Sequence, residues 1–386
     1  MANVLIAGVG MTPFVPLGSG VSAAELAGRA IRAALEDARI DYDLVDQIFA
    51  ACVQGAAGSG EQALVPMGLS GIPLFNVGDG CASGSDALQM ARSSVLSGEA
   101  ECALALGFEC MPQGISSRAF FGLGEYPGEE WDSLSPRIDP QALLSRRQHP
   151  AALYAAQTNW LLTRLAVSEA SFDFVLSQAR AQARLNPYAV LNRSSERDGW
   201  LAPYLAPPAS GAAAVLVCSR GFALRYGVRG GVAILASARG SDLASELEAA
   251  TVLDVLGRAT TRRVAQKAYE QAGVGADEIN LVELHDQSVG DYMVFSAALG
   301  FCQECELNDF VQQPRNARGA PVAVCSSGGL LGRGHAPGAT GLAQLAELVW
   351  QLRGEAKARQ VAGARTALQH SAALGRSVSV TILQRI

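Results

Sequence analysis

A cysteine in a glycine-rich turn is the residue of this 386-residue chain best suited to covalent chemistry. Cys81 follows Gly78 and Gly80, and a helical pattern begins at about Asp86. A thiol at such a helix start lies beside unpaired backbone N–H groups and the positive end of the helix dipole, which favour the thiolate. The thiolate is the nucleophilic form of cysteine, so the turn predicts a nucleophile. The structural alternative is a small buried cysteine.

Two histidines have the chemistry to serve this nucleophile. His335 lies in the glycine-rich stretch 326–341, just before another helical pattern, and an imidazole there can accept the thiol proton. His285 follows the predicted strand that ends near Glu283. The residue types therefore predict a nucleophile and a base, with a second imidazole at the end of a strand.

The elements that position these residues alternate between strand and helix, which predicts an α/β fold with a mostly parallel sheet covered by helices. The predicted strands are 4–9, 45–53, 73–77, 101–107, 212–218 and 232–236, and the predicted helices are 23–38, 59–69, 86–96, 151–165 and 168–186. The regular pattern fails over 112–150, where prolines and arginines gather, and loops of this length are usually functional.

The second half of the chain repeats the first. The helix-to-strand stretch 33–48 is echoed by 268–282, and the helix after Cys81 is echoed by the helix after His335. Each of these two helices closes at a Gly-Glu-Ala sequence, 98–100 and 354–356. The repeat predicts two similar α/β halves.

Composition narrows the function classes. The net charge of −6 provides no basic surface for nucleic acid, and no apolar run approaches the ~18 residues of a membrane span. The first residues lack a basic leader and predict a strand, not an export signal. Eight scattered cysteines indicate reduced thiols and a cytoplasmic protein, and the lone pair Cys302 and Cys305 predicts no metal site.

The segments 81–88 and 104–111 together resemble the nucleophile segment of the thiolase superfamily, closest to thiolases of the sterol-carrier-protein type, and the resemblance covers nearly the whole chain. It implies the thiolase fold, two α/β halves forming an α-β-α-β-α layered core with an irregular loop domain. The expected division is 1–240, including the loop region 112–200, and 241–386. The two helix starts would then converge at one site, where Cys81 accepts an acyl group from a coenzyme A thioester that is a substrate and not a bound cofactor.

The resemblance also assigns the other site residues. The stretch around His335 resembles the family's Gly-His-Pro loop, although Ala336 precedes the proline, and it implies that Gly328, Gly329 and Gly338 contact substrate. At 285–288 the family has His-Asp-Cys-Phe, and its cysteine acts as acid/base in the carbon–carbon step. The family's histidine helps to bind the thioester oxygen, so the resemblance implies that His285 donates to a developing oxyanion. Gln287 replaces the cysteine, and an amide does not titrate.

Two further residues have both a catalytic and a structural interpretation. Cys325 stands where the family commonly has Asn, and its thiol either replaces the missing acid/base or fills a buried strand end. His370 belongs to a final segment that lacks the family's run of glycines, where the side chain of Arg376 is available to enter the site. Both interpretations stay open for Cys325 and for His370.

The substrate and partner predictions follow from the same resemblance. Coenzyme A phosphates need cations, and the loop supplies Arg118, Arg137, Arg146 and Arg147, which a solvated surface loop explains equally well. The family is at least dimeric, and some of its members work with a small OB-fold partner protein. The expected function is a thiolase-like acyltransferase of lipid metabolism. The rivals are acyl transfer to an activated carbon or a heteroatom, and a non-catalytic acyl-CoA- or lipid-binding protein.

Overall fold

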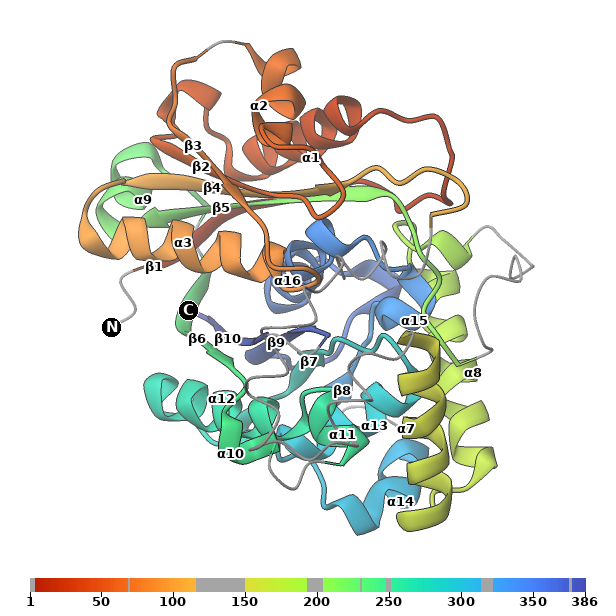
Figure 1. Ribbon diagram of the computed structural model, residues 1–386. Helices are drawn as coiled ribbons and strands as arrows, with labels where there is room; N and C mark the ends of the chain where they lie inside the picture. Colours follow the sequence, from red (N-terminus) through yellow and green to blue (C-terminus); the bar gives the residue numbers. More distant parts are fainter. Residues whose placement is uncertain are drawn as a thin grey trace.

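The computed structural model describes residues 4–68, 70–115, 150–192, 204–229, 231–247, 251–313, 322–374 and 377–386. Figure 1 shows five layers, in which a sheet from each half of the chain is covered outside by helices and the two sheets enclose a central helical layer. The α/β class and the layered thiolase architecture predicted from the sequence are confirmed.

Within the described residues, each half contributes five strands. Those of the first half are β1 (Val4–Met11), β2 (Gln47–Ala51), β3 (Leu74–Val77), β4 (Cys102–Glu109) and β5 (Gly211–Ser219). Those of the second half are β6 (Val232–Ser241), β7 (Leu281–Glu283), β8 (Ala323–Val324), β9 (Thr366–Ala373) and β10 (Ser377–Arg385). The spatial order is β3-β2-β4-β5-β1-β6-β10-β9-β7-β8, and the sheets join where Leu5 of β1 pairs with Ala233 of β6.

The strand order shows the internal repeat directly. In the first half β2 pairs in parallel with β3 and β4, and in the second half β7 pairs in parallel with β8 and β9. The remaining pairs within each half are antiparallel: β4 with β5 and β5 with β1 in the first half, and β9 with β10 and β10 with β6 in the second. By this equivalence β6 is the counterpart of β1. The expected division at 240/241 falls inside β6, so a boundary just before Val232 respects the repeat better, and we propose it.

The helices are arranged by the same repeat. The first sheet is covered by α1 (Ala23–Ala38), α2 (Ser59–Leu64) and α9 (Arg220–Tyr226), and the central layer holds α3 (Ser83–Ser97) and α16 (Pro337–Arg353). The second sheet is covered by α10 (Ala244–Leu247), α11 (Val252–Val255), α12 (Arg258–Ala272), α13 (Val289–Ala298) and α14 (Leu307–Gln312). The remaining helices, α7 (Pro150–Arg164), α8 (Glu169–Leu185) and α15 (Gly329–Arg333), lie toward one end. Single 3-10 turns lie at Tyr42–Leu44, Val65–Met67, Val190–Asn192, Ala276–Glu278, Glu304–Glu306 and Lys357–Arg359.

Close packing of the central helices brings the two helix starts together. A Cβ atom on Gly84 of α3 would lie 2.8 Å from the carbonyl oxygen of Gly338 in α16, and one on Gly107 of β4 would lie 2.3 Å from the same oxygen. Glycine is therefore required at both positions. The N–H of Gly338 donates to Glu109 Oε2 at 2.9 Å, so a carboxylate at the end of β4 satisfies the first turn of α16. This contact ties the two halves together beside the site.

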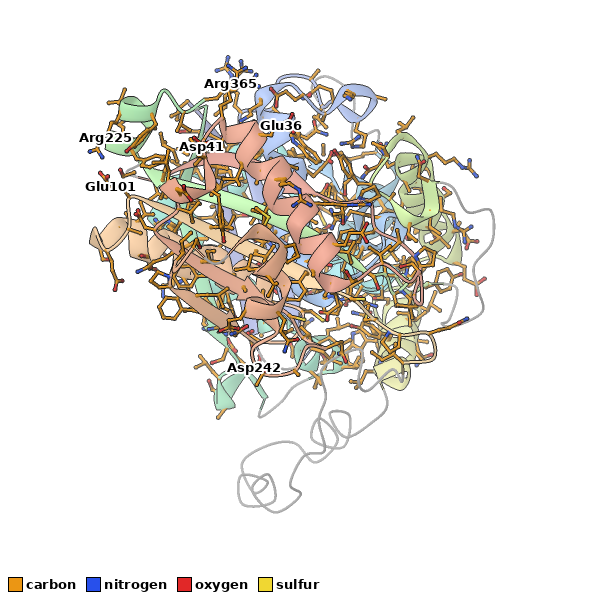
Figure 2. All side chains as sticks on the ribbon, turned by 90° about the horizontal axis from the view of Figure 1, so that it is seen from above. Glu36, Asp41, Glu101, Arg225, Asp242 and Arg365 are labelled. Atoms are coloured by element: carbon orange, nitrogen blue, oxygen red, sulfur yellow. The ribbon has the colours of Figure 1, made fainter. Side chains whose placement is uncertain are left out.

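Charged residues of the first half lie mainly at the periphery. Figure 2, seen from above, shows Arg225 and Glu101 at the edge of the molecule, where their side chains form an ion pair of 2.6 Å. Glu36 and Asp41 lie on the covering face near α1. Within the described part of the chain, no helix has the length and apolar character needed to cross a membrane.

Candidate active site

The turn that carries Cys81 is held by its own hydrogen bonds. Gly80 has φ +51°, and Ser83 Oγ accepts the N–H of Asp79 and donates to the carbonyl of Gly80, both at 2.7 Å. The residue before α3, Ala82, provides no side-chain cap, and the N–H of Ser83, the first of the helix, donates to the carbonyl of Gly80 at 3.2 Å. Cys81 is 1% exposed and lies at this helix start, as the sequence predicts.

His335 is clamped by backbone contacts just before α16. Its N–H donates to the Pro207 carbonyl and its carbonyl accepts the N–H of Ala209, both at 2.9 Å. Gly334, with φ +99°, ends α15 and allows the chain to turn into this position. The side chain is fully buried, and its Nε2 lies 3.1 Å from Cys81 Sγ. The structure therefore pairs two residues that are 254 positions apart in the sequence.

A threonine fixes which nitrogen of His335 carries the proton. Thr340 Oγ1 donates its one proton to the carbonyl of Ala336 at 3.0 Å, so toward His335 Nδ1, at 2.8 Å, it acts as acceptor. Nδ1 then holds the hydrogen, and the Nε2 lone pair faces Cys81. Burial, followed by the neighbouring His285 and Arg333, lowers the pKa of His335 well below its usual value. The ring is thus neutral and able to accept the thiol proton.

His285 completes a group of three. It follows β7, its ring meets the His335 ring edge-on with centroids 5.1 Å apart, and ligand atoms of Cys81, His285 and His335 all lie within 4.8 Å of one another. Burial, and then the charge of Arg333, lowers the pKa of His285 to about 3, so its ring is a neutral N–H donor. Three such donors could also hold a metal ion, so a chelator belongs among the controls of any assay.

His370 is occupied by structural hydrogen bonds. In β9, its Nδ1 accepts the backbone N–H of His285 at 3.4 Å, which leaves Nε2–H to donate to Thr261 Oγ1 at 3.1 Å. The ring also packs on Phe295, with centroids 4.6 Å apart. Both nitrogens are in use, so the geometry favours the structural interpretation, in which His370 positions the backbone of His285.

Neither Gln287, which replaces the family's acid/base cysteine, nor Cys325 lines the cavity beside Cys81. Gln287 is fully buried, and its amide oxygen and nitrogen have no partner among the described residues. Cys325 has φ +51°, and its sulfur accepts the N–H of Leu284 at 3.4 Å. Burial raises the pKa of Cys325 well above its usual value, and the carboxylates of Asp286 and Glu283 raise it further. The structure therefore does not support Cys325 as a base.

A small cavity of about 10 Å³, roughly the space of one water molecule, opens beside the nucleophile. Its lining residues are Cys81, Tyr154, Leu256, His285, Asp291, Phe295, Ala372 and Leu374. Neither Asp291 nor Tyr154 was identified from the sequence. A signal for Asp291 was present, because Ser288 and Asp291 have the Ser-x-x-Asp spacing of a helix start, directly after the strand that carries His285.

The three glycines expected to contact substrate are all explained by packing. A Cβ on Gly328 would lie 3.0 Å from the nitrogen of Ala183, one on Gly329 would lie 2.0 Å from Asp286 Oδ2, and one on Gly338 would lie 2.7 Å from the carbonyl oxygen of Phe108. None of the three lines the cavity beside Cys81. Their predicted contact with substrate gains no support from this geometry. The five predicted arginines, Arg118, Arg137, Arg146, Arg147 and Arg376, lie outside the described residues.

Comparisons with known proteins show the family of the chain. Residues 4–119 match the family model "Thiolase, N-terminal domain", and residues 244–385 match "Thiolase C-terminal domain-like". Human "Sterol carrier protein 2" is 34% identical over 99% of this chain and 72% of its own, and the "Acetyl-CoA acetyltransferase" of Methanothermobacter thermautotrophicus is 29% identical over all of both.

Solved structures show the same fold. The "Ltp2-ChsH2(DUF35) aldolase" superposes with a TM-score of 0.78 at 22% identity, covering 100% of this chain and 98% of the other. Human mitochondrial 3-ketoacyl-CoA thiolase in complex with CoA superposes with a TM-score of 0.70 at 18% identity, again over 100% and 98%. Family models match both halves of the chain, and a relative is 34% identical over 99% of it. The chain therefore belongs to the thiolase family.

Proposed function

We propose that this protein is an acyltransferase that forms an acyl-enzyme on Cys81 from an acyl-CoA thioester. The observation that carries the proposal is the 3.1 Å contact between Cys81 Sγ and His335 Nε2, with Thr340 holding the other ring nitrogen. A nucleophile, a base and a residue that orients the base are the components of covalent acyl transfer. Family members named for acetyl-CoA acetyl transfer support the same substrate class.

The proposed acylation uses each member of the group once. His335 accepts the proton of Cys81 as the sulfur attacks the thioester carbonyl carbon, and His285 donates a hydrogen bond to the oxyanion that forms. Collapse of the tetrahedral intermediate breaks the bond between the carbonyl carbon and the sulfur of coenzyme A. The coenzyme A thiolate then takes the proton back from His335, and the acyl group remains on Cys81.

The rival proposals differ in the fate of the acyl group. Transfer to an activated carbon or a heteroatom is favoured by Gln287, which cannot move a proton. A non-catalytic acyl-CoA- or lipid-binding protein is favoured by the relatives named sterol carrier protein and by β9, where His370 is fully hydrogen-bonded. Acylation of Cys81 separates the binding protein from both transferases.

We also propose a homodimer formed through β3. This strand ends the sheet, and a row of unpaired N–H and C=O groups at a sheet edge is a site for pairing with another chain. Phe75 in β3 is 45% exposed, although it stacks on Phe49, and Val65 nearby is 63% exposed. A small OB-fold partner stays part of the proposal, because one solved relative is named for two components, Ltp2 and ChsH2. Light scattering of the purified protein, alone and with a candidate partner, tests both points.

The deciding experiment is the mass of the intact protein after incubation with a panel of acyl-CoA thioesters, with and without a chelator. We expect a mass increase of one acyl group in the natural protein and none in Cys81→Ser, because a hydroxyl in this place lacks the reactivity of the thiolate. Peptide mapping should place the group on Cys81. Equal labelling of the serine variant would contradict the assignment of the nucleophile, and absence of labelling with every thioester would favour the binding protein.

A further inference from the structure

The cavity beside Cys81 contains a carboxyl group that can supply the proton transfer that Gln287 cannot. We propose that Asp291 is the second acid/base residue of this site and moves the α-proton of a second acyl-CoA, so that the acyl-enzyme makes or cleaves a carbon–carbon bond. This inference rests on the proposed function, since it concerns the step after acylation of Cys81. It names a catalytic residue that the resemblance to the family does not provide.

Asp291 is held in place by a closed set of hydrogen bonds. It lies in the first turn of α13, is 2% exposed, and lines the cavity together with Cys81 and His285. Gln157 Nε2 of α7 donates to Asp291 Oδ1 at 2.7 Å, and Gln157 Oε1 accepts the hydroxyl proton of Ser288 at 2.8 Å. Ser288 Oγ in turn accepts the N–H of Asp291 at 2.8 Å. The carboxyl group is therefore oriented by the protein before substrate arrives.

The surroundings of Asp291 suit a group that gains and loses a proton near neutral pH. Burial raises its pKa to about 7, and hydrogen bonds from Gln157 and Ser288 lower it by less. The titratable groups that line the cavity with it are Cys81, His285, whose ring is neutral, and Tyr154 of α7, whose pKa burial raises well above its usual value. No arginine or lysine is among the lining residues. General acid/base catalysis is most effective at such a pKa.

Other described residues near the site are less suited to this step. His370 uses both ring nitrogens in hydrogen bonds, and Cys325 lies outside the cavity with its pKa raised by burial. Gln287 has no titrating group, and His335 already serves Cys81. The competing interpretation of Asp291 is structural, since a carboxylate one turn into a helix commonly stabilises the helix start.

The proposed step joins the acyl group on Cys81 to the α-carbon of a second acyl-CoA. The Asp291 carboxylate takes a proton from the α-carbon of the second acyl-CoA, and the resulting carbanion attacks the carbonyl carbon of the acyl group on Cys81. A carbon–carbon bond forms, the bond between that carbonyl carbon and Cys81 Sγ breaks, and the electron pair leaves on the sulfur. The proton on Asp291 returns to the thiolate through His335 or solvent. The products are a 3-ketoacyl-CoA and free Cys81, and thiolysis is the reverse.

The test measures two reactions in the same samples. Acylation is followed by the mass of the intact protein, and α-proton abstraction is followed by incorporation of deuterium into acetyl-CoA in D₂O. The variants are Asp291→Asn, which keeps an acceptor for Gln157, and Asp291→Glu, which keeps a carboxyl group. Asp254→Asn is a matched control, because Asp254 is a buried carboxylate in the first turn of α11 that caps its helix and pairs with Arg258 at 2.8 Å.

We expect Asp291→Asn to lose deuterium incorporation by about 100- to 10,000-fold relative to its own rate of acylation. Asp291→Glu should recover part of the exchange, and Asp254→Asn should leave the ratio of exchange to acylation unchanged. In the natural protein the exchange rate should rise with pH through a midpoint near 7 as the carboxylate forms, a limb that Asp291→Asn should lack. A structural role alone would not remove that limb.

Exchange does not require an acyl group on Cys81, so the two reactions are compared in the natural protein and separate the two proposals. In the natural protein, exchange that depends on Asp291 without any acylation would refute the proposed function and leave only the assignment of Asp291 as the base for the α-proton. Acylation with exchange that is equal in the natural protein and in Asp291→Asn would overturn this inference alone. Absence of both reactions would overturn both. If Asp291→Asn fails to fold, equal loss of acylation and exchange in Asp291→Glu would assign Asp291 a structural role.

Discussion

The two halves of the molecule have the same strand order but bury different chemistry. Among the described residues, the buried acidic, basic and imidazole side chains of the first half are Asp86 and Glu109. Those of the second half are Asp254, Glu283, His285, Asp286, Asp291, Arg333, His335, Glu347, Arg359 and His370. The duplicated fold therefore provides two equivalent helix starts, of which the first carries the nucleophile and the second is surrounded by groups that hold and move protons.

Two ion pairs join buried charges within the second half. Arg359 Nη2 pairs with Glu347 Oε2 at 2.8 Å, and Arg333 Nη1 lies 3.8 Å from Glu283 Oε2. Such pairs contribute little net stability, because desolvation offsets their attraction. Arg333 also favours the neutral form of His335, the form that the nucleophile requires. The buried charges of the second half therefore favour the neutral form of His335 at some cost in the free energy of unfolding.

The largest expected effect follows from removing the base contributed by the second half. His335→Ala should slow acylation of Cys81 by about 100- to 10,000-fold, because the thiol proton loses its acceptor. For the same reason, alkylation of Cys81 by iodoacetamide should shift to higher pH. Since the pKa of His335 is lowered, acylation by the natural protein should not decline as pH falls through 6.5. Stopped-flow alkylation and intact mass across pH provide the measurements. An unchanged pH profile in the variant would separate Cys81 from His335 functionally.

A matched change in the first half sharpens this comparison. Asp86 is also buried in the central layer, and burial raises its pKa to about 7, but its carboxylate pairs with Arg239 at 3.0 Å and does not line the cavity beside Cys81. Asp86→Asn should leave the rate and the pH dependence of acylation essentially unchanged. A loss as large as that of His335→Ala would show that proton transfer is not confined to the second half.

The next effect concerns the oxyanion. His285→Phe keeps a planar ring beside His335 but removes the N–H donor, so we expect acylation to fall by about 100- to 1,000-fold. The pH dependence of Cys81 alkylation should stay as in the natural protein, because alkylation forms no oxyanion. Comparing alkylation and acylation rates in one variant therefore isolates this role. A parallel loss in both rates would indicate that His285 acts through His335.

Several parts of the fold and site could be predicted because they depend on local sequence. The apolar spacing and Ser22 define α1 as observed, and the glycines before Cys81 indicate the turn that presents it. The repeat assigns Cys81 and His335 to equivalent helix starts, and the structure places them in contact.

The unpredicted parts depend on tertiary contacts between distant segments. The sequence does not show that Gln157 would reach Asp291, 134 residues away, or that Glu109 would satisfy Gly338, 229 residues away. The resemblance assigns Gly328 and Gly329 to substrate, yet close approach of helix and carboxylate explains them. The sequence leaves the role of His370 open because a ring nitrogen's partner depends on strand register, here the approach of β9 to the end of β7.

A smaller effect is expected on the free energy of unfolding, through the buried carboxyl group of Asp291. The pKa of Asp291 rises on folding from 3.8 to about 7, so its stabilising contribution is fully present below 3.8 and is lost as pH rises through 7. Asn is neutral at every pH. Relative to the natural protein, Asp291→Asn should therefore gain up to about 4 kcal/mol between pH 4 and pH 8. Urea unfolding of both proteins at the two pH values measures this difference, and an equal difference at both would mean that Asp291 stays charged when buried.

The smallest effect is expected at Gln287. This buried residue of the second half stands at the family's acid/base position but has no titrating group. Its amide oxygen and nitrogen have no partner among the described residues, so each bears a desolvation cost. Gln287→Met keeps the volume and removes both atoms, which should leave the free energy of unfolding unchanged or raise it by about 1 kcal/mol. Acylation and α-proton exchange should be unaffected, because Gln287 does not line the cavity. Gln287→Cys supplies the matched control: if Asp291 carries the proton, this variant should not accelerate thiolysis, whereas a clear acceleration would return the acid/base role to position 287.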